Sequence, residues 1–307
     1  MTASKRALSA SAFGTLLLIA FMMGANHVAA RLAFNNGVDV ATAVAFRSTV
    51  TTLVVAAVVL FYGVPIALTA NHKKFLPLIG GLIGLQSLCL YSSVARLPVA
   101  LALLAFNTYP LWAALWDRML YGHRTEPAVL KAMPVLLLGL AMALDVFGAA
   151  SGLGATAHWS QIGAGVAFGV AAAASFGLAM ILTQHEAGDL DGRVRTVSTL
   201  GISGLIALSV VGLQGGFHLP TNSATMSANA GWLGLSLLTF LYGTAFTIMF
   251  TVLPKLGVAG SSPIMNVEPV VALVLAWALL GQSIAAIQVA GALIVVGAVM
   301  WLGLRKR

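Results

Sequence analysis

The chain consists of a succession of uninterrupted apolar stretches, each long enough to cross a lipid bilayer as a helix. A helix that spans the hydrocarbon core needs about 20 residues, and in lipid only helices and closed barrels satisfy their backbone polar groups. Hydrophobic residues make up 60% of the 307 residues and charged residues only 8%, with a mean hydropathy of +0.98. These values exclude an ordinary water-soluble protein, and the apolar stretches predict an all-α, polytopic membrane protein.

Ten such stretches leave only short connections, so no separate soluble domain fits into the chain. The predicted spans cover residues 11 to 33, 40 to 62, 75 to 95, 98 to 120, 129 to 149, 160 to 184, 196 to 213, 230 to 252, 260 to 280 and 285 to 303. An even number of spans places both ends of the chain on the same side of the membrane.

Positive charge is distributed unevenly over the connections between these spans. Of the 16 lysine and arginine residues, all but Arg31, Arg47 and Arg96 fall on the side of the two chain ends. Cytoplasmic loops carry an excess of such residues, so we predict cytoplasmic N- and C-termini. This topology accounts for the formal net charge of +8 without a nucleic-acid partner. The single cysteine, Cys89, excludes a disulfide framework and a paired-cysteine metal site, and we expect no cofactor and no metal ion.

An internal repeat indicates how the spans are organised. A shift of the chain against itself by 159 residues matches Gly84 with Gly243, Leu97 with Leu256, Asn107 with Asn266, Pro110 with Pro269, and Gly122 with Gly281. The repeat unit contains five spans, and an odd number of spans makes the second copy enter the bilayer from the opposite side. Inverted repeats of this kind are typical of secondary transporters. We therefore predict two inverted five-helix repeats, residues 1–153 and 154–307.

The fourth and ninth predicted spans each carry the matched Asn-x-x-Pro sequence at mid-depth. Proline lacks an N–H group, so it bends a helix and frees the carbonyl four residues earlier, which then needs a partner or a polar cavity. Asn107 and Asn266 could supply that partner. Pro110 and Pro269 are therefore candidate hinges, and the alternative is that both are merely tolerated kinks in packed helices.

These features resemble the drug/metabolite transporter superfamily, in particular its ten-span, two-repeat EamA-type members. The resemblance rests on the repeat, the short loops, the proline late in each fourth span, and the glycine after that span, Gly122 and Gly281. His123 and Gln282 follow these glycines, where family members often have glutamate, so no role of that acid is transferred. The resemblance implies ten helices around a central cavity in the bacterial inner membrane and outward transport of small amphipathic metabolites. Overall likeness is greatest to bacterial exporters of aromatic and other hydrophobic amino acids.

Ionisable residues within the membrane are costly and by default indicate function. Glu268 could bind a substrate ammonium group or titrate as a coupling site, or it is a protonated carboxyl group hydrogen-bonded to a neighbouring helix. Arg47 could meet a substrate carboxylate, pair with Glu268 or Asp39, or extend to the outer surface. His27, next to Asn26, could sense pH or be a packing residue. Glu268, His27 and Arg47 are the coupling candidates.

Polar and aromatic residues also collect at mid-depth in other spans. They could supply the apolar walls and fixed polar groups of an amino-acid pocket, and helix packing is the alternative for each of them. The candidate substrate-binding residues are Gln86, Tyr91, Asn107, Tyr109, Trp112, Phe176, Tyr242, Thr244, Asn266 and Glu268. A cavity lined by these residues is mostly uncharged, which disfavours multiply charged substrates such as nucleotide sugars.

We predict a secondary transporter that exports neutral, bulky amino acids by alternating access. The alternative is an exporter of cationic or lipophilic drugs in which Glu268 is the counter-charge. An intramembrane enzyme would need a His-Glu-x-x-His motif, a Gly-x-Ser-x-Gly motif or facing aspartates, and the sequence contains none of these. A receptor remains an alternative, but an inverted repeat favours symmetric access over one-sided sensing. Proton antiport and uncoupled export both stay open, as does the oligomeric state.

Overall fold

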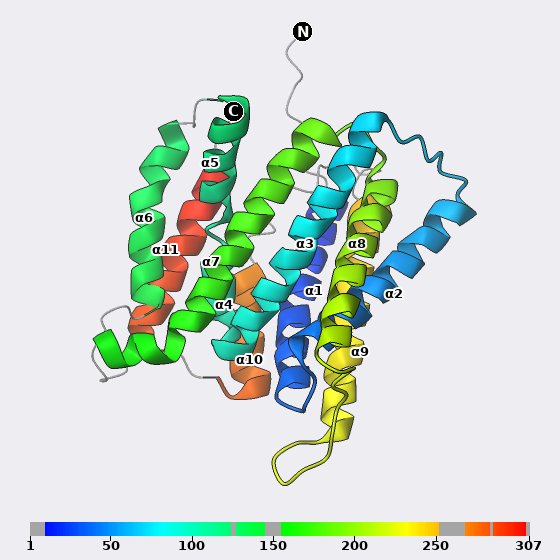
Figure 1. Cartoon of the computed structure of the whole chain (residues 1–307). Helices are drawn as coiled ribbons and strands as arrows, with labels where there is room; N and C mark the ends of the chain where they lie inside the picture. The colour runs from blue at the N-terminus through cyan, green and yellow to red at the C-terminus, as the bar shows by residue number, and fades with distance from the viewer. Residues whose placement is uncertain (1–9, 124–126, 145–154, 252–267, 283–284, 305–307) are drawn as a thin grey trace.

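A computed structural model of the chain describes residues 10–123, 127–144, 155–251, 268–282 and 285–304. These residues form helices and no strands, which confirms the predicted all-α class. The helices are α1 (Ala10–Phe34), α2 (Val40–Phe61), α3 (Ala70–Arg96), α4 (Val99–Phe106), α5 (Tyr109–Tyr121), α6 (Pro127–Ala143), α7 (Ala155–Glu186), α8 (Gly192–Leu213), α9 (Ala228–Thr251), α10 (Glu268–Leu280) and α11 (Ala286–Leu304). Together they form one bundle, in which the first turn of α1 and the last turn of α11 lie at the same end (Figure 1).

The helices identify a multi-pass membrane protein. Seven helical segments in the described part of the chain are long and apolar enough to cross a membrane: Phe13–Phe34, Val40–Phe61, Ala70–Arg96, Val99–Tyr121, Ile162–Glu186, Gly192–Leu213 and Ala228–Met249. Three shorter apolar helices, Lys131–Ala143, Glu268–Leu280 and Ala286–Ala298, lie within the remaining three predicted spans. The predicted ends of two of these, 145–149 and 260–267, are outside the described residues, so ten spans in two inverted repeats stay a prediction.

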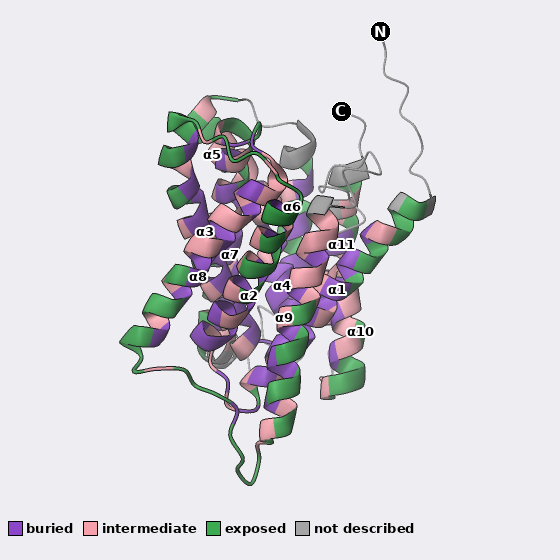
Figure 2. Ribbon diagram, turned by 90° about the vertical axis from the view of Figure 1, so that its right-hand side faces the viewer, coloured by how far each residue is buried: buried purple, intermediate pink, exposed green. Residues whose placement is uncertain are grey.

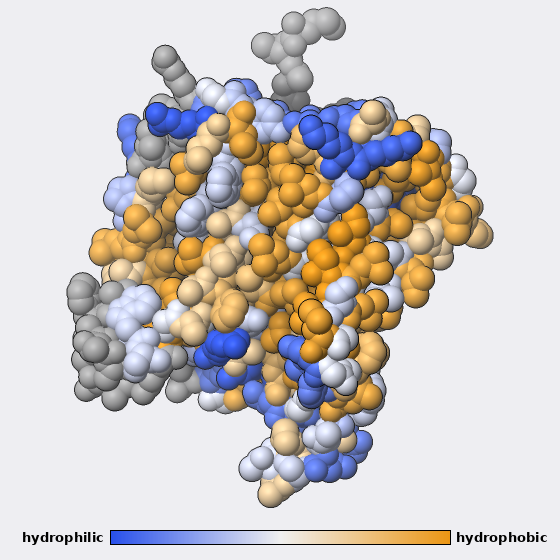
Figure 3. Space-filling model, viewed as in Figure 1, coloured by the Kyte–Doolittle hydropathy of each residue, from blue (hydrophilic) through white to orange (hydrophobic). Residues whose placement is uncertain are grey.

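The outer surface of the bundle is apolar. Leu53 of α2, Leu205 of α8, Phe240 of α9, Trp277 of α10 and Leu293 of α11 are all at least 60% exposed. Figure 2 shows buried residues along the inward sides of the helices and exposed ones on the outward sides. In Figure 3 the hydrophobic colour covers most of the middle of the visible face, and the hydrophilic colour gathers toward its two ends. An exposed apolar surface of this extent fits a lipid environment, because water would penalise it.

Helices from the two halves of the sequence pack side by side throughout the core. Helix α1 packs against α9 and α10, α2 against α8 and α9, α3 against α7 and α8, α7 against α4 and α5, α6 against α11, and α4 against α10. Each of these pairs joins a helix that ends before residue 144 with one that begins after residue 154. The interior is therefore shared between the two halves of the chain.

Glycines let several of these helices approach closely. A Cβ atom added at Gly80 of α3 would lie 2.7 Å from the Cβ of Ile202 on α8, and one added at Gly169 of α7 would lie 2.8 Å from the Cβ of Ala105 on α4. Both distances are below van der Waals contact, so only glycine fits at these positions. In lipid, where apolar burial does not drive association, such close backbone packing is a main source of helix association.

The predicted fourth span, 98 to 120, is not one helix but two, α4 and α5, separated by Asn107 and Thr108. The Asn107 N–H still donates to the carbonyl of Leu103 (2.8 Å), but the Thr108 hydroxyl group donates to the carbonyl of Ala105 (2.8 Å). Pro110 is the second residue of α5, where a helix needs no N–H donor. Among the described hydrogen bonds, the Thr108 hydroxyl group donates to a carbonyl at the break, that of Ala105. The predicted pairing of the Asn107 side chain with the carbonyl of Phe106, four residues before Pro110, stays a prediction.

The matching proline, Pro269, is the second residue of α10. It thus opens a helix, as Pro110 does in α5. Asn266 and the other residues just before α10 lie outside the described part of the chain. The predicted role of both prolines as hinges stays a prediction.

Candidate functional site

Polar and aromatic side chains from five helices meet in the interior of the bundle. This central polar cluster consists of Asn26 and His27 of α1, Arg47 of α2, Gln86, Ser87 and Tyr91 of α3, Tyr242 of α9, and Glu268 of α10. All of these side chains except Glu268 are buried. Helices α9 and α10 come from the second half of the chain, so the cluster lies where the two halves meet.

Arg47 is the cation of this cluster and is only 3% exposed. Its Nη2 donates to Ser87 Oγ (2.7 Å) and its Nη1 donates to Tyr91 Oη (3.1 Å). The guanidinium group also lies over two aromatic rings, 3.9 Å from the centroid of Tyr242 and 4.5 Å from that of Tyr91. Such stacking stabilises a desolvated cation by about 2 kcal/mol or more.

The predicted ion pairs of Arg47 are wrong. None of the ion pairs in the described part of the chain joins Arg47 to an acid, and the buried side chain does not extend to the outer surface. Asp39 instead caps α2 by accepting from the N–H of Thr42 (2.9 Å), and it lies 3.6 Å from the ring of His218. Glu268 pairs with His27. A buried cation held by neutral groups alone retains much of its attraction for an added anion.

Tyr91 connects the two sides of the cluster. Its hydroxyl group accepts from Arg47 and donates to Asn26 Oδ1 (2.9 Å), and its ring meets the ring of His27 edge to face at 5.8 Å. Tyr91 is fully buried, so these bonds hold both α1 and α2 against α3. The candidate role of Tyr91 is therefore to position Arg47 as much as to contact a substrate.

The contact between His27 and Glu268 joins α1 to α10. The Nε2 of His27 lies 3.1 Å from Oε1 of Glu268, whose side chain is 20% exposed, whereas that of His27 is 3% exposed. Glu268 is the first residue of α10, where the partial positive charge of a helix N-terminus favours a carboxylate. His27 and Glu268 were both predicted as coupling candidates, and the structure places their side chains in direct contact. Their role in coupling stays a prediction.

Two buried nitrogen donors of the cluster, Asn26 Nδ2 and Arg47 Nε, have no hydrogen-bond partner among the described residues, and neither has the ring nitrogen Nδ1 of His27. A buried donor without a partner costs about 1 to 3 kcal/mol, so native proteins rarely retain one without a reason. Hydrogen-bonding capacity that the protein leaves unused at a mixed polar and aromatic site is suited to a polar ligand.

An aromatic cluster lies between α4, α5 and α7. The ring of Phe176 lies 5.1 Å from that of Tyr109 and 5.3 Å from that of Phe106. Trp112, one turn after Tyr109, packs against Gly177, where an added Cβ would lie 3.0 Å from the Trp112 Cβ. The structure thus places Tyr109 and Phe176 in contact and Trp112 beside Gly177, the residue after Phe176. Their predicted role in substrate binding stays a prediction. The structure adds Phe106, which the sequence reasoning missed because nothing distinguishes one phenylalanine in an apolar stretch.

The remaining predicted residues have weaker connections to the site. Gln86 is buried and its Oε1 accepts from Ser87 Oγ at 3.4 Å, so it supports the residue that binds Arg47. Thr244 is half-buried on α9, two residues after Tyr242, and Asn107 is buried at the break between α4 and α5. An apolar recess lies between α4, α10 and α11 and includes Leu104, Pro269 and Val289 in its lining. The predicted aqueous central cavity stays a prediction.

Comparison with known proteins indicates a transporter domain and a shared fold. Residues 163–304 match the model of the EamA-like transporter family, so the chain carries an EamA-like transporter domain. This family indicates a membrane transporter of small metabolites or drugs rather than an enzyme. A search of curated proteins found no match. A solved structure titled "Crystal structure of protein" has a TM-score of 0.57 over 92% of this chain and 96% of that chain at 20% sequence identity, a likeness that shows a shared fold.

Proposed function

We propose that the protein is a secondary transporter whose two halves, α1 to α6 and α7 to α11, are inverted repeats that give the central polar cluster access to each side of the membrane in turn. The match to a transporter family covers the second half, and the predicted repeat relates the first half to it. In such proteins, substrate sites lie near the midplane at the interface of the repeats. The position of the cluster between the halves supports this assignment.

The packing of the helices also supports two related halves. The proposed repeat pairs α1 with α7, α2 with α8, α3 with α9, α4 and α5 with α10, and α6 with α11. When each helix is replaced by its counterpart, the contact of α1 with α9 becomes the contact of α7 with α3. The contact of α3 with α8 becomes that of α9 with α2, and the contact of α1 with α10 becomes that of α7 with α4 and α5. All of these contacts are present. A pseudo-twofold relation between the halves would account for these matched contacts.

The proposed substrates are neutral amino acids with bulky apolar side chains. The observation that carries this proposal is the buried guanidinium group of Arg47, which neutral partners hold without an acid, so that it can bind a substrate carboxylate. Glu268 is the group that can bind the substrate ammonium, and His27 is in contact with its carboxylate. The side chain of the substrate would contact aromatic rings such as Tyr109 and Phe176.

A second candidate substrate class is supported by Glu268 alone. Its carboxylate is partly exposed and lies in an otherwise apolar helix, α10, next to the apolar recess. A lipophilic cation could use Glu268 as counter-charge and the recess for its apolar part. Such a substrate would not need Arg47, and this difference separates the two candidates.

The proposed location is the bacterial inner membrane, with both chain ends in the cytoplasm. The distribution of lysine and arginine supports this orientation, because Lys73 and Lys74 at the start of α3 and Arg193 and Arg195 at the start of α8 precede spans on the side assigned to the cytoplasm. The first turn of α1 and the last turn of α11 lie at one end of the bundle, as that orientation requires (Figure 1).

The test is counterflow of labelled phenylalanine into proteoliposomes that contain only this protein and are preloaded with unlabelled phenylalanine. We expect accumulation of label that protein-free liposomes do not show, with leucine and tryptophan competing and choline not competing. A parallel run with an imposed pH gradient distinguishes antiport from uncoupled export. Counterflow of a lipophilic cation without that of phenylalanine would establish the second candidate, and movement of neither solute would exclude a transporter of these classes.

A further inference from the structure

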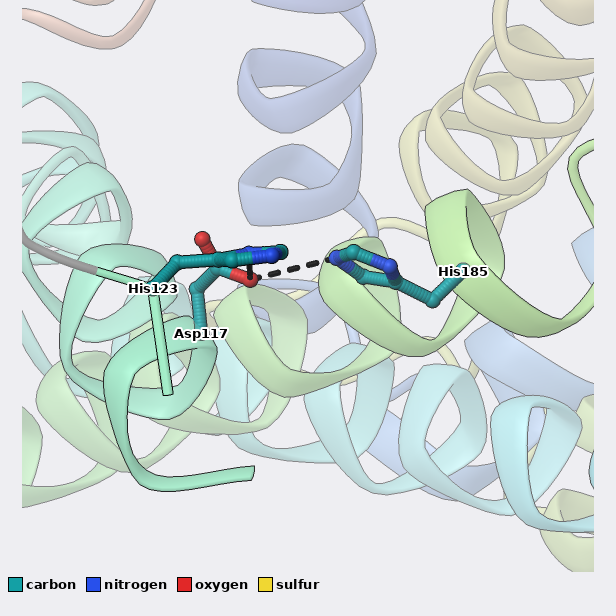
Figure 4. A group of neighbouring side chains, drawn as sticks. All are labelled: Asp117, His123 and His185. Atoms are coloured by element: carbon teal, nitrogen blue, oxygen red, sulfur yellow. Dashed lines mark hydrogen bonds and ion pairs between the residues drawn. The ribbon is translucent and has the colours of Figure 1, made fainter. Parts of the chain in front are cut away.

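A group of three possible metal ligands lies at one end of the bundle, apart from the central polar cluster. Asp117 is in the last turns of α5, His123 follows the end of that helix, and His185 is in the last turn of α7 (Figure 4). His123 Nδ1 lies 3.0 Å and His185 Nε2 lies 3.1 Å from the same oxygen, Oδ1 of Asp117. The three side chains are 28%, 57% and 25% exposed, respectively, so an ion in solution can reach them.

The backbone after α5 brings His123 over Asp117. Gly122 is the residue after α5 and adopts a left-handed conformation with φ of 71°, which turns the chain back toward the helix. A residue with a Cβ atom is strained there, whereas glycine is not. The turn places the imidazole ring of His123 beside the carboxylate one and a half turns earlier, as Figure 4 shows.

From this geometry we propose that Asp117, His123 and His185 bind a divalent transition-metal ion of the zinc type. Two ligand atoms that bind Zn²⁺ at about 2.0 to 2.1 Å with a tetrahedral angle lie about 3.3 Å apart. The observed separations of 3.0 and 3.1 Å need to open by only a few tenths of an ångström, and all three ligand atoms lie within 4.8 Å of one another. Two imidazoles and one carboxylate form a donor set that zinc uses with a fourth position left for water.

The surroundings hold the ligands in place without competing for the metal. The ring of Tyr121 stacks on the ring of His185, with centroids 3.9 Å apart and planes 18° apart, and so fixes its orientation. The Tyr121 hydroxyl group donates to Glu186 Oε1 (2.6 Å), and Asn71 Nδ2 donates to Glu186 Oε2 (2.9 Å). The carboxylate of Glu186 is therefore occupied next to the site. Support of this kind for the ligand residues raises metal affinity.

A metal ion at this site would connect α5 from the first half of the chain to α7 from the second half. The two helices already pack against each other. A metal ion that bridges the ends of α5 and α7 would restrict movement of the two halves relative to each other. This consequence rests on the proposed transport mechanism. Metal binding itself does not depend on that mechanism and is measured without it.

The test is a Co²⁺ titration of the purified, tag-free full-length protein after removal of metals with EDTA. Co²⁺ bound tetrahedrally absorbs visible light, so we expect an absorption band that saturates at one equivalent and disappears when Zn²⁺ is added. His185→Ala and His123→Ala should each weaken Co²⁺ binding at least tenfold. His123 is exposed and lies after the helix end, so its replacement leaves the fold intact even if His185→Ala destabilises the protein.

The matched control is His218→Ala, because His218 is a comparably exposed histidine with an aspartate 3.6 Å away, Asp39. This variant should bind Co²⁺ as the unchanged protein does. Absence of a saturable band, or equal weakening by His218→Ala and His123→Ala, would overturn the proposal. An unchanged titration in the His123→Ala and His185→Ala variants would do the same, since the ion would then bind elsewhere.

Discussion

The central polar cluster and the Asp117 cluster, that is Asp117, His123 and His185, both place histidine against a carboxylate, but in different environments. In the interior, Arg47 is buried and its hydrogen-bond partners, Ser87 and Tyr91, are neutral. At the end of the bundle, Asp117 is partly exposed and lies within hydrogen-bonding distance of two histidines. Water screens the exposed group, so a lost contact there costs little, whereas a change in the interior leaves groups without partners or solvent. The difference predicts that substitutions in the interior cluster lower transport more than substitutions in the surface cluster do.

The largest difference in counterflow is expected between substitutions of two arginines, the buried Arg47 and the exposed Arg96. Arg47→Met should lower phenylalanine counterflow about 100-fold, because removal of one partner of a buried charged contact costs about 2 to 5 kcal/mol. Arg96 is exposed near the end of α3, where its Nη1 donates to the carbonyl of Ser92 in the same helix (2.9 Å), so Arg96→Met should change counterflow less than twofold. Initial rates in proteoliposomes with equal amounts of reconstituted protein measure both. Equal losses of counterflow in the two variants would show that the loss does not depend on burial of the arginine.

The next largest difference is expected for two glutamates. Glu268→Gln removes the negative charge beside His27 and should lower counterflow about tenfold, which corresponds to about 1.4 kcal/mol, without lowering the amount of protein inserted in the membrane. Glu186→Gln, at the end of the bundle, should retain counterflow within a factor of two. Quantified membrane fractions separate insertion from transport. Full activity of Glu268→Gln would remove this residue from the mechanism.

A smaller effect is expected when a single tyrosine hydroxyl group is deleted. Tyr91→Phe leaves Asn26 Oδ1 and Arg47 Nη1 without their partner, so it should lower the free energy of unfolding by about 1 to 3 kcal/mol and the thermal midpoint by several degrees. Tyr121→Phe removes the bond to Glu186, which water can replace, so its midpoint should fall much less. Thermal unfolding of both variants in the same detergent is the measurement. A larger loss for Tyr121→Phe would contradict the comparison.

The smallest effect is expected for a third pair, His72 and Asp189, at the end of the bundle that carries Asp117. Hydrogen bonding to the His72 ring (2.9 Å) lowers the pKa of Asp189 below its usual range. The contact between Asp189 and His72 therefore contributes its full stabilisation above the ordinary aspartate pKa of about 4. This stabilisation is lost as the pH falls through the lowered pKa of Asp189. Asp189→Asn should lower the thermal midpoint slightly at pH 6, and the two proteins should converge once the pH is below the lowered pKa of Asp189. A difference that persists in acid would assign the effect to packing instead.

The positions of these residues along the chain explain how much of the site could be predicted. Glu268 and Arg47 could be found from the sequence, because a charge within an apolar stretch is rare whatever surrounds it. Their partners could not, because contacts between helices depend on rotation and depth in the bundle, which hydropathy does not specify. The predicted pairing of Arg47 with Glu268 or Asp39 failed for this reason. The Asp117 cluster escaped notice because His185 lies 68 residues after Asp117, at a separation that matches no short metal motif.

By itself, the sequence determined that the protein crosses the membrane as apolar helices, since a lipid environment leaves the backbone few alternatives and the cost of each charge in it is high. Its Asn-x-x-Pro sequence also indicated that the fourth span is not a regular helix throughout. Only the tertiary structure decided that Tyr91 joins Arg47 to Asn26 and that His27 faces Glu268. It also decided that the Thr108 hydroxyl group donates to a carbonyl at the break between α4 and α5. The physical reason is that burial in lipid acts on each residue separately and can be read one residue at a time, whereas a hydrogen bond between helices requires two side chains at the same depth and on facing sides.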